Sequence, residues 1–109
     1  VYRTVKGAYR DAPLSAEGAR RFGGRWNPKG YAVLYTTSSP ALALIESLVH
    51  QPRVPYQKLP PLFLITPEVP VGPSLDDVLF FPPEALPDYW NERSYERTQW
   101  LLRDWLEQP

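Results

Sequence analysis

Residues 22–30 read Phe-Gly-Gly-Arg-Trp-Asn-Pro-Lys-Gly, and this is the most informative segment for predicting the fold. Gly and Pro at this density interrupt helices and strands, so the segment is predicted to be a shaped loop. A plain connection does not need a Trp. A loop that lays backbone, a guanidinium and a flat ring against an anionic, planar ligand does. We therefore expect Gly24, Arg25, Trp26 and Asn27 to belong to a pocket for a nucleotide-like molecule.

The composition bounds the class of protein. With 109 residues, 43% of them hydrophobic and 14% aromatic, the chain is expected to be one ordered globular domain. Its 12 basic and 12 acidic side chains cancel, which argues against direct nucleic-acid binding. It has no Cys and a single His, so disulfides, thiol nucleophiles and multi-His metal sites are excluded and no metal is expected.

Targeting signals are missing from the sequence. No apolar run is long enough to cross a membrane and no signal peptide is visible, so we expect no membrane contact and a cytoplasmic location. The chain contains no Met and begins at Val1, so we expect it to be a processed or trimmed version of a longer protein.

Short strands alternate with helices in the predicted pattern. We expect strands at 1–5, 31–36 and 61–66, the last of them central because it is apolar throughout, and a short one at 78–81. We expect a helical turn within 8–21 and helices at 39–50 and 94–107. This mixture predicts an α+β fold.

Glu46 is the strongest single candidate for a catalytic residue. Ser39 and Pro40 open its helix as N-cap and first helical residue, and Glu46 is the only carboxylate in the apolar stretch that follows. The small Ala43, one turn earlier, would leave room beside it. The alternative is a solvated glutamate that pairs with His50 at i,i+4.

Arg3, Arg25 and Tyr35 have competing interpretations. Arg3 lies mid-strand, where an inward guanidinium needs an anionic partner, although an edge strand would leave it in solvent. Arg25 has the better setting for a diphosphate, because glycines let the backbone approach and its planar fork suits phosphate. Tyr35 either stacks on a ligand or packs in the core with its hydroxyl at the rim.

These motifs occur in an order that resembles a known family. They are Tyr2-Arg3, the Gly23–Asn27 loop with Gly30, Val33-Leu34-Tyr35, and residues 39–46. In this order and spacing they are similar to the RES-domain family, the toxin half of RES–Xre toxin–antitoxin pairs. Residues 86–90, 98–99 and 105–106 extend the resemblance over nearly the whole chain.

The family is named for an Arg, a Glu and a Ser. Arg3 matches the Arg and Glu46 matches the Glu. The Ser belongs to a Val-Pro-Ser-like segment beyond a later strand, and Ser94 is no convincing match because it precedes Thr98-Gln99. We therefore expect residues 1–109 to form a single RES-like domain that lacks its C-terminal segment.

The resemblance implies an ADP-ribosyltransferase-like fold, with small mixed or antiparallel sheets and flanking helices. It implies an enzyme that cleaves the nicotinamide–ribose bond of NAD, with water or phosphate as acceptor. NAD would be its substrate, with no prosthetic group, and an Xre-like helix-turn-helix antitoxin its partner. Protein ADP-ribosylation, a catalytically silent nucleotide-binding module and a homodimer remain alternatives.

The same resemblance assigns roles to the candidate residues. Glu46 would hold the ribose and stabilise the positive charge that develops on it. Arg3 and Arg25 would hold the diphosphate or the neighbouring ribose. Tyr35 would flank the nicotinamide, and Trp26 and Asn27 would shape the loop. Tyr2 and Gly24 complete the predicted pocket.

Overall fold

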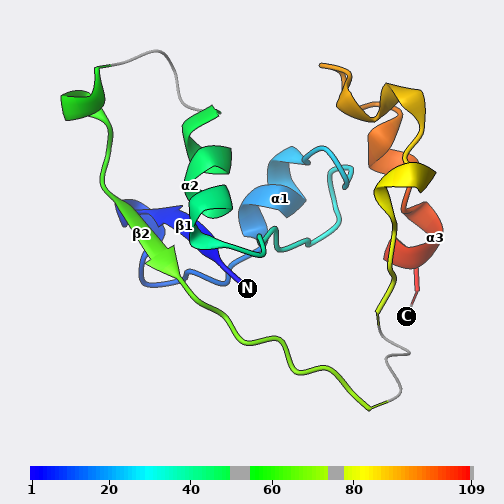
Figure 1. Cartoon of the computed structure of the whole chain (residues 1–109), viewed down its shortest axis with the longest axis horizontal. Coiled ribbons are helices and arrows are strands. Elements are labelled where there is room, and N and C mark those ends of the chain that lie inside the picture. The colour runs from blue at the N-terminus through cyan, green and yellow to red at the C-terminus, as the bar shows by residue number, and fades with distance from the viewer. Residues whose placement is uncertain (50–54, 74–77, 109) are drawn as a thin grey trace. The chain divides into compact units, whose positions relative to one another are not determined.

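The computed structural model describes residues 1–49, 55–73 and 78–108 (Figure 1). Its regular elements are β1 (Arg3–Lys6), α1 (Glu17–Phe22), α2 (Pro40–Val49), β2 (Leu62–Ile65) and α3 (Arg103–Leu106). Short 3-10 turns occur at Gly7–Tyr9, Tyr56–Lys58, Pro83–Ala85, Asp88–Asn91 and Thr98–Trp100. The mixture of helices with a small antiparallel sheet is of the α+β kind.

The chain divides into two compact units. The first comprises Val1–Ser15 and Tyr35–Pro70, and the second comprises Ala16–Leu34 and Val71–Pro109. The first unit holds β1, β2 and α2, whereas the second holds α1, α3 and the glycine-rich loop.

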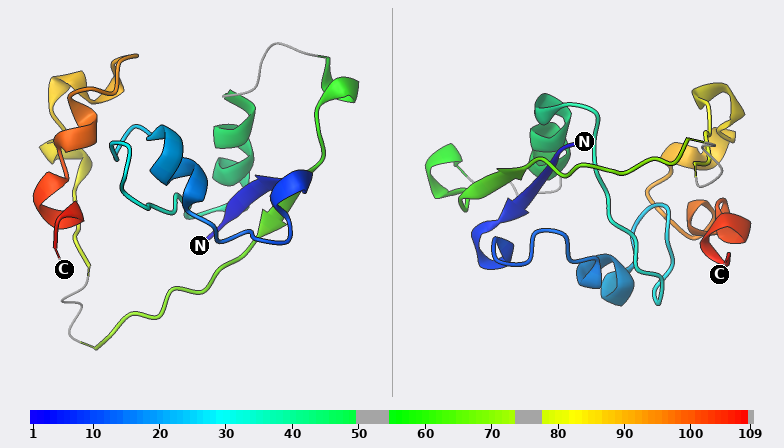
Figure 2. Two further views of the ribbon diagram at one scale, coloured as in Figure 1. Left: turned by 180° about the vertical axis from the view of Figure 1, so that it is seen from behind. Right: turned by 90° about the horizontal axis from the view of Figure 1, so that it is seen from below.

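In the first unit, β1 and β2 form an antiparallel pair whose register runs from Arg3 opposite Ile65 to Lys6 opposite Leu62. Helix α2 packs on β1, and the two elements lie beside each other in Figures 1 and 2. Among the described residues of this unit, the buried apolar side chains are Val5, which is 6% exposed, and Ala43, which is 3% exposed. A small residue at position 43 lets the helix approach the strand closely.

Helix α2 begins where the sequence predicts. The Ser39 hydroxyl accepts a hydrogen bond from the Leu42 amide at 3.1 Å, and Pro40 is the first helical residue. His50 lies outside the described residues. The apolar stripe of α2 is left largely uncovered: its exposed residues are Leu42, Leu44, Ile45, Leu48 and Val49. A short two-stranded sheet offers too little surface to cover so broad a stripe.

Two strand predictions are confirmed, at β1 and β2, but the central position of β2 is wrong. In the described part of the chain β2 pairs only with β1, and Phe63 and Leu64 are exposed. A strand can therefore be apolar on both faces without being covered on both.

The predicted strand at 31–36 is also wrong, because these residues pair with no other strand that the structure describes. Side chains take up some of its carbonyls instead: Asn27 bonds that of Tyr31, and Arg3 bonds that of Tyr35. The strand propensity of this segment is therefore overridden by tertiary contacts.

The helix predicted at 94–107 is interrupted. Only Thr98–Trp100 and α3 are helical, and turns join them. Thr98 is fully buried, and its hydroxyl donates to the Tyr95 carbonyl at 3.3 Å. A β-branched residue with such a local bond competes with regular helix.

Two smaller predictions have opposite outcomes. The helical turn expected within 8–21 is confirmed, as Gly7–Tyr9 and α1. The strand expected at 78–81 is wrong, because these four residues are irregular and exposed.

Candidate functional site

The predicted site residues are shared between the units. The first unit contains Tyr2, Arg3, Tyr35 and Glu46, and the second contains Gly24, Arg25, Trp26 and Asn27. Each group is built by a different kind of local structure.

Arg3 is a half-buried cation with an unused donor. Its Nη1 donates to the Tyr35 carbonyl at 3.0 Å, while its Nε is buried and has no hydrogen-bond partner within the described ranges. Burial lowers the pKa of Arg3 from its ordinary value, but the guanidinium stays charged at any physiological pH. An unsatisfied donor on a buried cation is costly, and an anionic ligand would relieve that cost.

Tyr2 precedes Arg3 in the chain, and Tyr35 contacts the Arg3 guanidinium through its backbone carbonyl. Tyr2 exchanges two backbone hydrogen bonds with Thr37, at 2.9 and 2.8 Å. Tyr35 lies two residues before Thr37 and supplies the carbonyl that holds Arg3. The structure thus brings Arg3 and Tyr35 together, through the Tyr35 carbonyl.

Glu46 is exposed on α2, beside the side of the helix that contacts β1. That side consists of Ala43 and Ser47: the Thr4 hydroxyl donates to the Ala43 carbonyl at 3.2 Å and hydrogen-bonds the Ser47 hydroxyl. Consecutive helical residues are rotated by about 100°, so Glu46 lies at the margin of this contact.

Arg3 and Glu46 therefore come from elements that contact each other. Because neighbouring strand residues face opposite sides and Thr4 faces α2, Arg3 projects from the other face of β1.

The glycine-rich loop is organised around Asn27, which is fully buried. Its Nδ2 lies 3.0 Å from the Ala19 carbonyl and 3.1 Å from those of Pro28 and Tyr31. The Gly24 amide returns a bond to the Asn27 carbonyl at 2.9 Å. Asn27 thus holds the loop from within, through side-chain bonds to three backbone carbonyls.

One nitrogen of the Arg25 guanidinium is hydrogen-bonded within the second unit. Its Nη1 donates to the carbonyls of Trp90 and Glu92, both at 3.0 Å, and its guanidinium lies 4.6 Å from the centre of the Tyr95 ring. No hydrogen bond from its Nε or Nη2 is found in the described part of the chain. That edge is the one with which an arginine grips phosphate in bidentate fashion. The neighbouring Trp26 is half-buried.

Sequence reasoning missed three polar residues that organise these groups. Thr4 and Ser47 join β1 to α2, and the Gln99 side chain donates to the Gly24 carbonyl at 3.0 Å. A polar residue in the middle of a strand and a Ser one turn after Ala43 were visible signals for the first two. Nothing local in the sequence points from Gln99 to Gly24.

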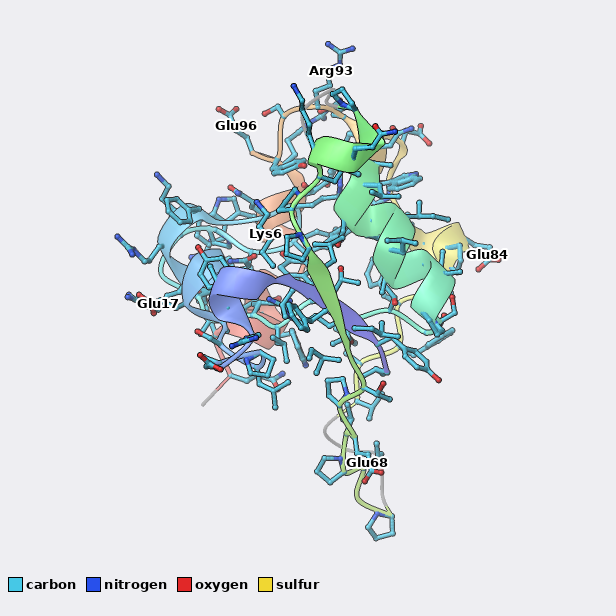
Figure 3. The ribbon with its side chains drawn as sticks, turned by 90° about the vertical axis from the view of Figure 1, so that its left-hand side faces the viewer. Lys6, Glu17, Glu68, Glu84, Arg93 and Glu96 are labelled. Atoms are coloured by element: carbon cyan, nitrogen blue, oxygen red, sulfur yellow. The ribbon has the colours of Figure 1, made fainter. Side chains whose placement is uncertain are left out.

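An open groove of about 600 Å³ lies within the second unit; no predicted site residue lines it, although the carbonyl of one lining residue, Glu92, accepts from Arg25. Its lining consists of Pro87, Asp88, Tyr89, Glu92 and Arg97. Arg97 forms a 2.5 Å ion pair with Glu92 and stacks over the Tyr89 ring at 4.2 Å. The nearby Arg93 and Glu96 side chains point outward in Figure 3. The groove's arginine is already satisfied by these partners.

Neither a metal centre nor a membrane span emerges from the described ranges. No group of three or more His, Cys, Asp or Glu side chains there could hold a metal ion. None of the helices described has the length and hydrophobicity that a membrane crossing needs.

Several curated proteins resemble this chain over part of its length. A protein called Toxin Res from Yersinia enterocolitica is 46% identical over 50 residues, which are 46% of this chain and 33% of that protein. The Prs ADP-ribosylating toxin of a Sphingobium species is 50% identical over 42 residues, or 38% of this chain and 26% of that protein.

A third relative comes from Mycobacterium tuberculosis. Its NAD(+) phosphorylase MbcT is 54% identical over 41 residues, which are 37% of this chain and 22% of that protein. The matched stretches thus span a third or less of these relatives.

The family comparison covers more of the chain than these pairwise matches do. The model of the RES domain matches residues 1–109, which include both groups of predicted site residues. The chain therefore belongs to the RES domain family.

Proposed function

We propose that this chain belongs to an NAD-degrading toxin that cleaves the bond between nicotinamide and ribose. Membership of the RES domain family and the similarity to proteins named Toxin Res and NAD(+) phosphorylase support the proposal. The structural observation that carries it is Arg3, a half-buried cation whose Nε has no partner among the described residues. The diphosphate of NAD is an anion suited to such a donor.

The chemistry requires little beyond electrostatics. The bond between C1′ of the ribose and the ring nitrogen breaks, and its electron pair returns to that nitrogen, so nicotinamide leaves neutral without a general acid. Positive charge develops on the ribose, as in glycoside hydrolysis. We assign to Glu46 the task of holding the 2′-hydroxyl and stabilising this charge. Glu46 is an exposed residue of α2, the helix that contacts the strand of Arg3.

The diphosphate and the nicotinamide ribose are separate parts of one extended molecule, so Arg3 and Glu46 need not touch. Tyr2, which precedes Arg3, and Tyr35, whose carbonyl accepts from Arg3, remain predicted ligand contacts in the first unit. The loop residues Gly24, Arg25, Trp26 and Asn27 remain predictions for the second unit. The open Nε–Nη2 edge of Arg25 supports its role as an anion ligand.

Two acceptors complete the reaction in different ways. Water yields ADP-ribose and a proton, whereas inorganic phosphate yields ADP-ribose 1″-phosphate. We favour phosphate because a relative is named an NAD(+) phosphorylase. Protein ADP-ribosylation is the second candidate, because another relative is named an ADP-ribosylating toxin. Family membership also leads us to propose an ADP-ribosyltransferase-like fold and an Xre-like antitoxin as partner.

Nicotinamide release from NAD tests the proposal, measured by chromatography with and without phosphate. Glu46→Gln should reduce the rate of nicotinamide release by at least about 100-fold, because it removes the negative charge that stabilises the developing cation. The circular dichroism of the variant should be unchanged. Glu68→Gln is the matched control, since it makes the same change at an exposed position of the same unit.

The outcomes separate the candidates. A phosphate requirement identifies phosphorolysis, and transfer of labelled ADP-ribose onto protein identifies the second candidate. An unaltered rate in folded Glu46→Gln protein would remove Glu46 from the mechanism. The absence of both nicotinamide release and label transfer in the unaltered protein would contradict the proposed function.

A further inference from the structure

The contact between β1 and α2 is more polar than the contact between a strand and a helix needs to be. Its central side chain is Thr4, whose Oγ1 donates to the Ala43 carbonyl at 3.2 Å and also hydrogen-bonds the Ser47 Oγ. A hydroxyl has a single proton. Since Thr4 gives its proton to the carbonyl, Ser47 must donate to Thr4. A directed chain therefore runs from Ser47 through Thr4 to Ala43.

This series of hydrogen bonds specifies one register of α2 against β1. Sliding α2 along β1 by one residue would move each helical side chain by about 1.5 Å along the axis and rotate it by about 100°. Apolar side chains tolerate such shifts, because their contacts are non-directional. Hydrogen bonds between half-buried hydroxyls do not, because each donor and acceptor would lose its partner.

The two hydroxyls are sequence neighbours of the two candidate catalytic groups. Thr4 follows Arg3 on β1, and Ser47 follows Glu46 on α2. We propose that Thr4 and Ser47 are positioning residues, which fix the height and rotation of Glu46 relative to Arg3 across the contact between strand and helix. This inference rests on the proposed function of Arg3 and Glu46, since it concerns how those two groups are held.

The kinetic test removes each hydroxyl and then restores it. Thr4→Val and Ser47→Ala should each lower kcat for nicotinamide release about tenfold or more with a smaller change in KM, because they misplace groups that act in the transition state. The kcat of the double variant should be little lower than that of either single variant, because each single substitution already breaks the hydrogen bonds that fix the register. Thr4→Ser keeps the hydroxyl and should retain most of kcat. Thr66→Val makes the same change at an exposed site just after β2 and serves as the matched control.

Disulfide formation between introduced cysteines reports the register, and its rate does not depend on enzymatic activity. The chain contains no cysteine, so an introduced pair has no competitors. Thr4→Cys/Ser47→Cys should oxidise readily, and the oxidised form should turn over NAD faster than its reduced form. Thr4→Cys/Leu48→Cys moves the second thiol one residue around α2 and should oxidise more slowly.

These outcomes distinguish the inference from the function on which it rests. If Glu46→Gln abolishes release while Thr4→Val and Ser47→Ala keep their kcat, the proposed function stands and the positioning role is overturned. Equal rates of oxidation for the two cysteine pairs would also overturn it, because the register would not be fixed. If the unaltered protein does not act on NAD, both claims fall, whichever pair oxidises.

Discussion

The two units hold their candidate residues by opposite means. In the first unit, Arg3 and Glu46 stand on regular elements, and their relative placement follows from the contact of β1 with α2. In the second unit, Arg25 stands on an irregular loop, whose form depends on side chains bonded to backbone carbonyls. The first arrangement can be damaged by changing a packing contact, and the second by removing a single amide. Different substitutions are therefore expected to destabilise the two units.

The distribution of tryptophan allows the units to be followed separately. All four Trp residues, at positions 26, 90, 100 and 105, belong to the second unit. Urea unfolding monitored by Trp fluorescence therefore reports on that unit. Hydrogen exchange of the α2 and β1 amides reports on the first.

The largest expected effect comes from Asn27→Ala. It empties a fully buried position and removes the donor shared by the carbonyls of Ala19, Pro28 and Tyr31. The second unit should lose about 3 kcal/mol of stability, seen as a lower urea midpoint by Trp fluorescence. Asn91→Ala, at an exposed position, should leave the midpoint nearly unchanged. Equal midpoints for the two variants would show that Asn27 does not hold the loop.

Gly23→Ala tests the backbone conformation of the same loop. Gly23 has φ 74°, a conformation that side chains rarely adopt, and an added Cβ would lie 3.2 Å from both the Asn27 carbonyl and Gln99 Nε2. We expect a loss of about 2 kcal/mol by the same fluorescence measurement. Gly18→Ala is the matched control: its Cβ meets nothing within 4 Å, and it lies in α1, so it should stabilise slightly. Destabilisation by both would indicate a cause other than the Gly23 backbone.

Ala43→Leu tests the packing of the first unit. Ala43 is 3% exposed at the contact with β1, so a larger side chain should force the helix away and cost about 1 to 2 kcal/mol. Faster hydrogen exchange in α2 and β1 should reveal this loss. Ala41→Leu places the same side chain on an exposed part of α2 and should slow exchange or leave it unchanged. The contact would have to be looser than described if Ala43→Leu behaved like Ala41→Leu.

Ser39→Ala should have a smaller effect on the same unit. It removes the hydroxyl that accepts from the Leu42 amide at the start of α2, at a cost of about 1 kcal/mol. Exchange should accelerate in the first turn of α2. Ser38→Ala removes an exposed hydroxyl just before the cap and should not have this effect. The cap would be irrelevant if both variants exchanged alike.

The smallest expected effect concerns Glu17 and Arg20 on the surface of α1. The Arg20 side chain donates to the Glu17 carboxylate and lowers its pKa. A lowered pKa in the folded state means that the stabilisation is present at neutral pH and is lost as the pH falls through that pKa. Arg20→Gln should return the Glu17 pKa toward its ordinary value, as carboxyl NMR titration would show. Arg21→Gln should move it less, and a larger shift there would contradict the assigned pairing.

Short-range signals account for the elements that sequence analysis predicted correctly. The Ser39-Pro40 cap predicted the start of α2, and apolar or alternating residues predicted β1 and β2. The glycines and the proline of residues 22–30 predicted an irregular loop, and the loop is irregular. Each of these signals acts within a few residues, so the chain itself displays it.

The failures share a different cause. Residues 31–36 have strand-forming side chains but no partner strand in the described part of the chain. Residues 94–107 have helical spacing, but only Thr98–Trp100 and α3 are helical, and the buried Thr98 bonds locally to the Tyr95 carbonyl. In both cases contacts from elsewhere, or a competing local bond, override the propensity.

The sequence by itself determined the family, the candidate Arg3 and Glu46, and the loop that carries Arg25, because motif order and local chemistry are properties of the chain. Only the tertiary structure decided that Thr4 meets Ser47, that Tyr35 holds Arg3 by its carbonyl, and that Gln99 holds Gly24. Each of those contacts joins residues more than 30 positions apart. Hydrogen bonds need both partners in place, and no pattern within a short window specifies the distant one.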